Sequence, residues 1–113
     1  MKRGVIGLTV DVTIKGKSEQ KKVKAKIDTG ADKSSIDTSL ALQLNLGPVI
    51  KTGGIRSAHG RTLRPIIKTA IQINGKELTS YFNIADREHM KYKILIGKNT
   101  LKKLNSLIDP KKK

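Results

Sequence analysis

Apolar and polar residues alternate along most of the chain, which is the pattern of β-strands with one buried face. The alternation is clearest within residues 5–14, where every second residue from Leu8 to Ile14 is apolar. This segment is predicted to be the first strand. The same pattern predicts further strands over residues 21–27, 65–73 and 77–84, with shorter ones over 34–36 and 92–96.

Turn and helix signals are few and separate these strands. Asn74-Gly75 is a strong hairpin signal between two predicted strands. Helical spacing is found over residues 39–44, with Thr38 or Ser39 as the expected N-cap, and over residues 98–105. The pattern therefore predicts an all-β domain with little helix.

Length and composition predict one small domain, residues 1–113. Its hydrophobic content of 36% suffices for a single modest core. The chain has no cysteine, which excludes disulfides, thiolate catalysis and cysteine-bound zinc. No apolar run reaches membrane-spanning length and no signal-peptide core is present, so we expect a cytoplasmic protein without a membrane partner.

The net charge of +15 has two interpretations. Lysines on the outer faces of strands increase solubility, or they attract nucleic acid or another anionic surface. Only three aromatic residues are available for stacking on bases. This scarcity argues against nucleic acid binding as the main function.

The run Asp28-Thr29-Gly30-Ala31 is the principal candidate for chemistry. It follows the predicted strand 21–27, so the carboxylate lies at a strand end where a tight turn begins. Thr29 can hydrogen-bond locally, and Gly30 permits close approach of the backbone. Such a loop holds one carboxylate at a surface where a second chain can meet it.

Three motifs in the right order make this chain resemble the retropepsin-like aspartic proteases, the single-domain class of retroviral proteases. Ile27–Asp32 resembles the catalytic loop, Gly53–Gly60 the flap, and Ile94–Asn99 the segment that supports the loop and starts the C-terminal helix. Within that clan the chain looks closest to the retropepsin-fold family labelled ATP-dependent zinc proteases. The resemblance covers most of residues 23–104.

This resemblance implies an acid-protease closed barrel with a flap hairpin and one short C-terminal helix. It implies an aspartic endopeptidase that hydrolyses peptide or protein substrates as a symmetric homodimer, with one catalytic Asp28 from each chain. The terminal segments, residues 3–6 and 107–108, are candidate interface strands. Two alternatives stay open: a catalytically silent peptide-binding or dimerisation module, and a basic nucleic-acid-binding β domain.

The resemblance also assigns supporting roles. Thr29 would hold the two catalytic loops together across the axis, and the carbonyl of Gly30 would bind the substrate strand. Asp32 would pair with Lys98 or Arg87; the family usually has Arg where this chain has Lys98. The other supporting residues are Ala31, Gly97 and Asn99, the flap residues are Gly53, Gly54 and Ile55, and the candidate pocket residues are Ile36, Ile55, Ile66 and Ile96.

The zinc and ATP in that family label have no counterpart in the sequence. No His-Glu-x-x-His pair is present, and the two histidines, His59 and His89, are far apart. No phosphate-binding loop of the Gly-x4-Gly-Lys type is present. We therefore expect neither a metal site nor a cofactor.

Overall fold

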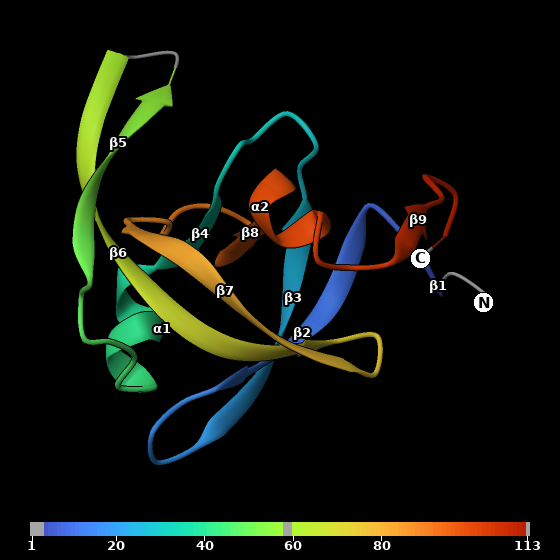
Figure 1. Cartoon of the computed structure of the whole chain (residues 1–113), viewed down its shortest axis with the longest axis horizontal. Helices are drawn as coiled ribbons and strands as arrows, with labels where there is room; N and C mark the ends of the chain where they lie inside the picture. The colour runs from blue at the N-terminus through green and yellow to red at the C-terminus, as the bar shows by residue number, and fades with distance from the viewer. Residues whose placement is uncertain (1–3, 58–59, 113) are drawn as a thin grey trace.

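The computed structural model describes residues 4–57 and 60–112 and shows a closed β-barrel (Figure 1). Six strands close it in the order β2, β3, β8, β4, β7 and β6, and β6 pairs back onto β2. The strand β5 extends the sheet as the antiparallel partner of β6. The predicted all-β closed barrel is confirmed. These strands span Thr9–Lys15 (β2), Gln20–Ile27 (β3), Ser34–Asp37 (β4), Lys51–Ser57 (β5), Gly60–Ile73 (β6), Lys76–Ala85 (β7) and Ile94–Ile96 (β8).

The prediction of one strand over residues 5–14 is wrong, because the chain forms two strands there. The first, β1 (Gly4–Ile6), leaves the barrel and pairs in parallel with β9 (Ser106–Ile108). The break falls at Gly7, where a Cβ atom would lie 2.2 Å from the carbonyl oxygen of Lys112. The C-terminal segment therefore packs directly on the backbone at this point, a contact that the local pattern does not reveal.

The hairpin predicted at Asn74-Gly75 is confirmed. It joins β6 to β7, with φ angles of 52° at Asn74 and 80° at Gly75. Asparagine and glycine tolerate these left-handed backbone angles better than other residues, which explains the sequence at the turn. The strand β6 is longer than predicted, because its first residues pair with β5 in the hairpin expected to be the flap.

Two short helices accompany the barrel. The first, α1 (Thr38–Gln43), is capped by Asp37, whose Oδ2 accepts a hydrogen bond from the backbone N–H of Ser39 at 3.1 Å. The expected caps, Thr38 and Ser39, are wrong by one or two residues. The C-terminal helix α2 (Lys98–Leu101) is confirmed but is shorter than the predicted 98–105. No helix in the described ranges is long and apolar enough to span a membrane.

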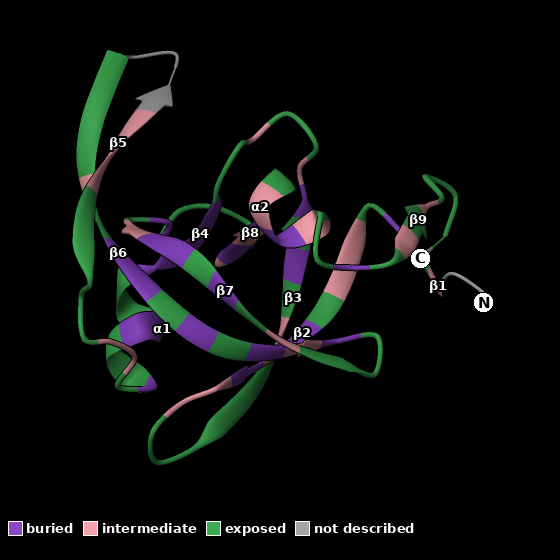
Figure 2. Ribbon diagram, viewed as in Figure 1, coloured by how far each residue is buried: buried purple, intermediate pink, exposed green. Residues whose placement is uncertain are grey.

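The core lies inside the barrel and follows the predicted alternation of buried and exposed positions (Figure 2). From Ile67 to Ile73 of β6, every second residue is buried, while the residues between them are exposed or half-buried. The C-terminal Leu104 is also buried and packs against the core. The largest fully buried side chains are Ile6, Val12, Ile14, Ile36, Leu44, Ile67, Ile71, Ile73, Phe82, Ile94, Ile96 and Thr100.

Candidate active site

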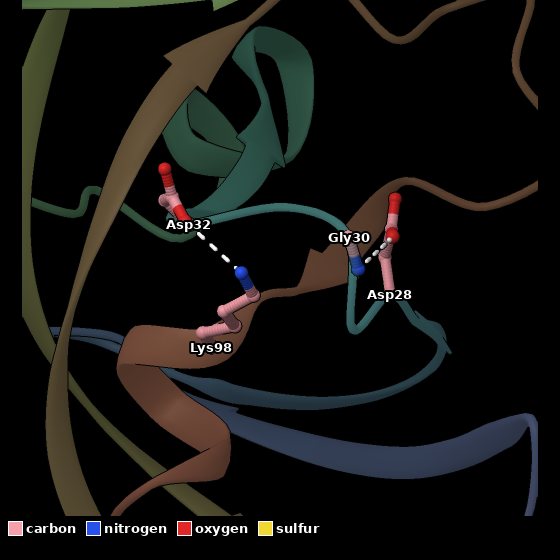
Figure 3. Close-up of polar contacts among 4 residues, drawn as sticks. All are labelled: Asp28, Gly30, Asp32 and Lys98. Carbon is pink, nitrogen blue, oxygen red and sulfur yellow. Dashed lines mark hydrogen bonds and ion pairs between the residues drawn. The ribbon is translucent and has the colours of Figure 1, made fainter.

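Asp28 immediately follows β3, at the end of its parallel pairing with β8. Ile27 is aligned with Ile96 of β8, and the backbone N–H of Asp28 donates to the carbonyl oxygen of Ile96 at 2.9 Å. The backbone N–H of Gly30 donates to Oδ1 of Asp28 at 2.9 Å, which closes a tight turn (Figure 3). The half-buried carboxylate is thus oriented by its own loop.

The first residues of α2 hold the Asp28 loop through backbone hydrogen bonds. The backbone N–H of Lys98 donates to the carbonyl oxygen of Ala31 at 2.8 Å, and that of Asn99 donates to Asp32 at 3.2 Å. A Cβ atom on Gly97 would lie 2.6 Å from the backbone carbonyl of Lys33. Glycine is therefore required at position 97, since any side chain would push the loop away.

The partner of Asp32 is Lys98. Its Nζ lies 3.4 Å from Oδ1 of Asp32 (Figure 3), so the structure selects it over Arg87, the other expected candidate. Both side chains are exposed, and exposed pairs of this kind contribute little to stability. The pair therefore orients the outer end of the loop more than it stabilises the fold.

A buried network of hydroxyl and amide groups lies behind the loop. Oγ of Ser34 accepts from the backbone N–H of Gly97 at 2.9 Å and donates to Oδ1 of Asn99 at 2.9 Å. It also lies 2.6 Å from the hydroxyl of Thr100, which in turn lies 2.8 Å from that of Ser80. Among the described residues, no buried side-chain polar atom is left without a partner. This network holds β4, β7 and α2 together beneath the candidate catalytic loop.

An open cleft of about 610 Å³ runs beside the loop, between it and the β5–β6 hairpin. The predicted flap residues Gly54 and Ile55 line this cleft, whereas Gly53 does not. The prediction that Ile36 and Ile96 line a substrate pocket is wrong, because both side chains are fully buried in the core. The remaining lining residues include Gly30, Ala31, Asp32, Lys33, Ser35, Arg64, Asn83, Arg87 and Leu95.

A second cleft of about 530 Å³ contains Asp28 itself. Arg87 lines both clefts, and its Nε donates to the carbonyl oxygen of Tyr92 at 3.0 Å. Burial and the nearby Arg64 lower the pKa of Arg87, while Asp37 and Asp28 oppose that shift. A guanidinium remains protonated in such a setting, so a fixed cation lines the cleft that contains the candidate catalytic carboxylate.

Several of these residues were missed in the sequence. Arg64 donates through Nη1 to Oδ1 of Asn83 at 3.2 Å, and Asn83 donates to the carbonyl oxygen of Ser34 at 2.9 Å. Each is an ordinary polar residue in a strand pattern. Only the strand register, in which Ser35 of β4 lies opposite Asn83 of β7, brings them to the cleft.

The flap corresponds to the hairpin of β5 and β6, which projects beyond the barrel (Figure 1). Its strands stay paired from Lys51 to Ser57, so most of the predicted tip, Gly53–Gly60, is paired strand; Ala58 and His59 lie outside the described residues. His89 is exposed on the loop before β8. Within residues 4–57 and 60–112, no three metal-binding side chains gather at one place.

Comparison with known proteins supports the fold and a family assignment for the greater part of the chain. The sequence profile described as RimB-like, retropepsin-like aspartic endopeptidase RimB, matches residues 38–113, which is more than half of the chain. The chain belongs to the RimB-like family. The retropepsin-like resemblance seen in the sequence is thereby confirmed. No curated protein matches the sequence.

Among solved structures, a protein of unknown function from Legionella pneumophila has the same fold as this RimB-like chain. The two share 20% sequence identity and a TM-score of 0.68, over 96% of this chain and 94% of that protein. This structural similarity supports the barrel fold and carries no information about function. Since the RimB-like match begins at residue 38, the assignment of Asp28 depends on the geometry of its loop.

Proposed function

We propose that this RimB-like protein is an aspartic endopeptidase that acts as a symmetric homodimer, with the catalytic dyad formed by Asp28 from each protomer. The supporting observation is the loop itself. Asp28 is held between Ile96 and Gly30 and opens into one cleft, while the neighbouring loop residues Gly30 and Ala31 line a second cleft beside the β5–β6 hairpin.

A dyad requires two carboxylates, and the loop supplies one Asp28 from each chain. Two carboxylates a few ångströms apart cannot both ionise at low cost, so they share one proton. The ionised member takes a proton from a bound water, which attacks the peptide carbonyl. The protonated member donates to the developing oxyanion and then assists the departing amine. A two-fold axis provides both roles from a single sequence.

The supporting residues follow from this arrangement. Thr29 is exposed beside Asp28, where it is available to bridge the loops of two protomers. Gly30 and Ala31 line the cleft, so their backbone groups are accessible to an extended peptide. The hairpin residues Gly54 and Ile55 form the opposite wall of that cleft. An extended strand bound between loop and hairpin would present its scissile bond to the dyad.

The charges beside the dyad favour acidic residues in the substrate. Arg64, Arg87 and Lys33 line the larger cleft, and Lys26 and Lys91 line the one that contains Asp28. Cations in a cleft raise the local concentration of anionic groups and slow the binding of cationic ones. Peptides with glutamate near the scissile bond should therefore be cleaved faster than matched peptides with lysine.

The decisive experiment compares Asp28→Asn with Asp11→Asn in a peptide-library digest. Asparagine is nearly isosteric with aspartate but cannot exchange a proton, so Asp28→Asn should abolish cleavage while the dimer stays folded. Asp11 lies on the exposed face of β2, and its substitution should leave turnover unchanged. Wild-type turnover in Asp28→Asn would refute the proposed dyad. A wild-type protein that binds peptides without cutting them would favour the silent module instead.

A further inference from the structure

A cluster of lysines surrounds one exposed tyrosine outside the clefts described above. The ring of Tyr81 lies on the outer face of β7 and is 42% exposed. The ammonium groups of Lys51 and Lys68 each lie 5.8 Å from its centroid, and that of Lys103 lies at 6.0 Å. These lysines come from β5, from β6 and from the turn after α2, so the fold gathers them from three separate segments.

A fourth lysine joins this surface from the candidate catalytic loop. Lys33 lines a shallow pocket of about 170 Å³ together with Lys51 and Tyr81. We call Lys33, Lys51, Lys68, Tyr81 and Lys103 the Tyr81 surface. Ile66, Asn83 and Asn99 complete the pocket.

No carboxylate within residues 4–57 and 60–112 forms an ion pair with the lysines of the Tyr81 surface. Elsewhere Lys15, Lys22 and Lys98 pair with carboxylates. None of the four lysines of the Tyr81 surface has a carboxylate partner among the residues that the structure describes. Cations that converge without a counter-ion repel one another, and a bound anion relieves that repulsion.

We propose that the Tyr81 surface binds single-stranded nucleic acid, with a base stacked on Tyr81 and phosphates on the lysines around it. An aromatic ring framed by cations is the arrangement that proteins use for single strands. Lysine acts as a point charge and does not read base edges in the bidentate way of arginine. The binding should therefore depend on salt and vary little with base sequence.

The scarcity of aromatic residues argued against nucleic acid as the main function. The structure adds that one of the three aromatic residues lies among lysines that have no carboxylate partner in the described residues. An acidic peptide would neutralise the lysines but would leave the ring without a role. Lys33 and Asn83 line both this pocket and the larger cleft, so a bound strand would lie beside the cleft.

The test uses the intrinsic fluorescence of the protein. The chain has two tyrosines and no tryptophan, so Tyr92→Phe leaves Tyr81 as its one tyrosine fluorophore. Titration of this variant with a ten-residue oligothymidylate should quench the emission as a base stacks on the ring. Quenching that is absent while labelled oligonucleotide still binds would overturn the proposed stacking.

Substitutions then separate stacking from charge. Tyr81→Ala should weaken oligothymidylate binding between about 5-fold and 150-fold, whereas Tyr81→Phe should stay within about twofold. Lys68→Gln should flatten the plot of log affinity against log salt by roughly 0.7. The matched control, Lys17→Gln, changes an exposed lysine in the β2–β3 turn and should have a smaller effect.

The competing ligand is oligoglutamate of equal charge. Equal affinity for oligoglutamate, together with full binding by Tyr81→Ala, would show that the surface binds acidic peptide and would overturn the proposal. Equal losses in Lys68→Gln and Lys17→Gln would show diffuse attraction and would also overturn it. Thermal melting shows whether Tyr81→Ala remains folded. The double variant Lys51→Gln/Lys68→Gln tests oligothymidylate binding with the Tyr81 ring intact.

Discussion

The hydroxyl of Thr100 offers the sharpest test of the network beneath the candidate catalytic loop. The residue is fully buried, and its Oγ1 lies 2.6 Å from Oγ of Ser34 and 2.8 Å from Oγ of Ser80. Valine has nearly the same shape but no hydroxyl. Thr100→Val should therefore remove two hydrogen bonds without opening a cavity.

The free-energy cost of Thr100→Val depends on which hydrogen bonds its two partners retain. The hydroxyl of Ser34 retains its bonds to Gly97 and Asn99, whereas the hydroxyl of Ser80 loses its bond to Thr100. A stranded buried hydroxyl and a lost bond together cost about 2–3 kcal/mol. For a domain of this size, the melting temperature should fall by roughly 8–12 °C.

The assay is urea unfolding followed by circular dichroism. The matched control is Thr79→Val, the same change at an exposed position of β7, which should alter stability by less than about 0.5 kcal/mol. The double variant Thr100→Val/Ser80→Ala removes both partners and should recover about 1 kcal/mol or more relative to Thr100→Val. A loss below about 0.5 kcal/mol in Thr100→Val, or strict additivity in the double variant, would refute the reasoning.

Three further outcomes are expected. Gly97→Ala should destabilise the protein by about 1–3 kcal/mol in urea unfolding, because its Cβ meets the backbone of Lys33, and an unchanged midpoint would contradict this. Arg87→Gln should slow the cleavage of glutamate-containing peptides, because it removes a cation that lines both clefts; Arg87→Lys should slow it less, and an unchanged rate would exclude this role. Moderate salt should strengthen the proposed homodimer by screening the charge of +15 on each protomer, and a monomer at all salt concentrations in sedimentation would argue against it.

The sequence predicted the parts of this molecule that depend on local pattern. The strand before Asp28 and the turn at Asn74-Gly75 can each be recognised from a few contiguous residues. The support at Gly97 was found because the motif around it is contiguous. These features need no knowledge of which strands become neighbours.

The parts that failed depend on contacts between distant segments. Ser34, Ser80 and Thr100 each look like surface residues, and their burial follows from the pairing of β4 with β7 and the packing of α2 on both. In the sequence, Gly7 looks like a single glycine within a continuous strand. In the structure, the backbone of Lys112 packs against it and the strand breaks there. Arg87 lies in a polar run that reads as an exposed loop, but its side chain is buried between the two clefts.

The parallel pairing of β1 with β9 has a consequence for how the protein folds. It joins Gly4 to Ser106 across almost the whole described chain, whereas β2 and β3 meet through a short hairpin. Closing so long a loop early carries a large entropic cost for only three residues on each strand. This pair should therefore form after the barrel has closed and exchange its amide hydrogens first. In the proposed homodimer, the segments expected at the interface would thus be the last to become ordered, and subunit association would be coupled to the final step of folding.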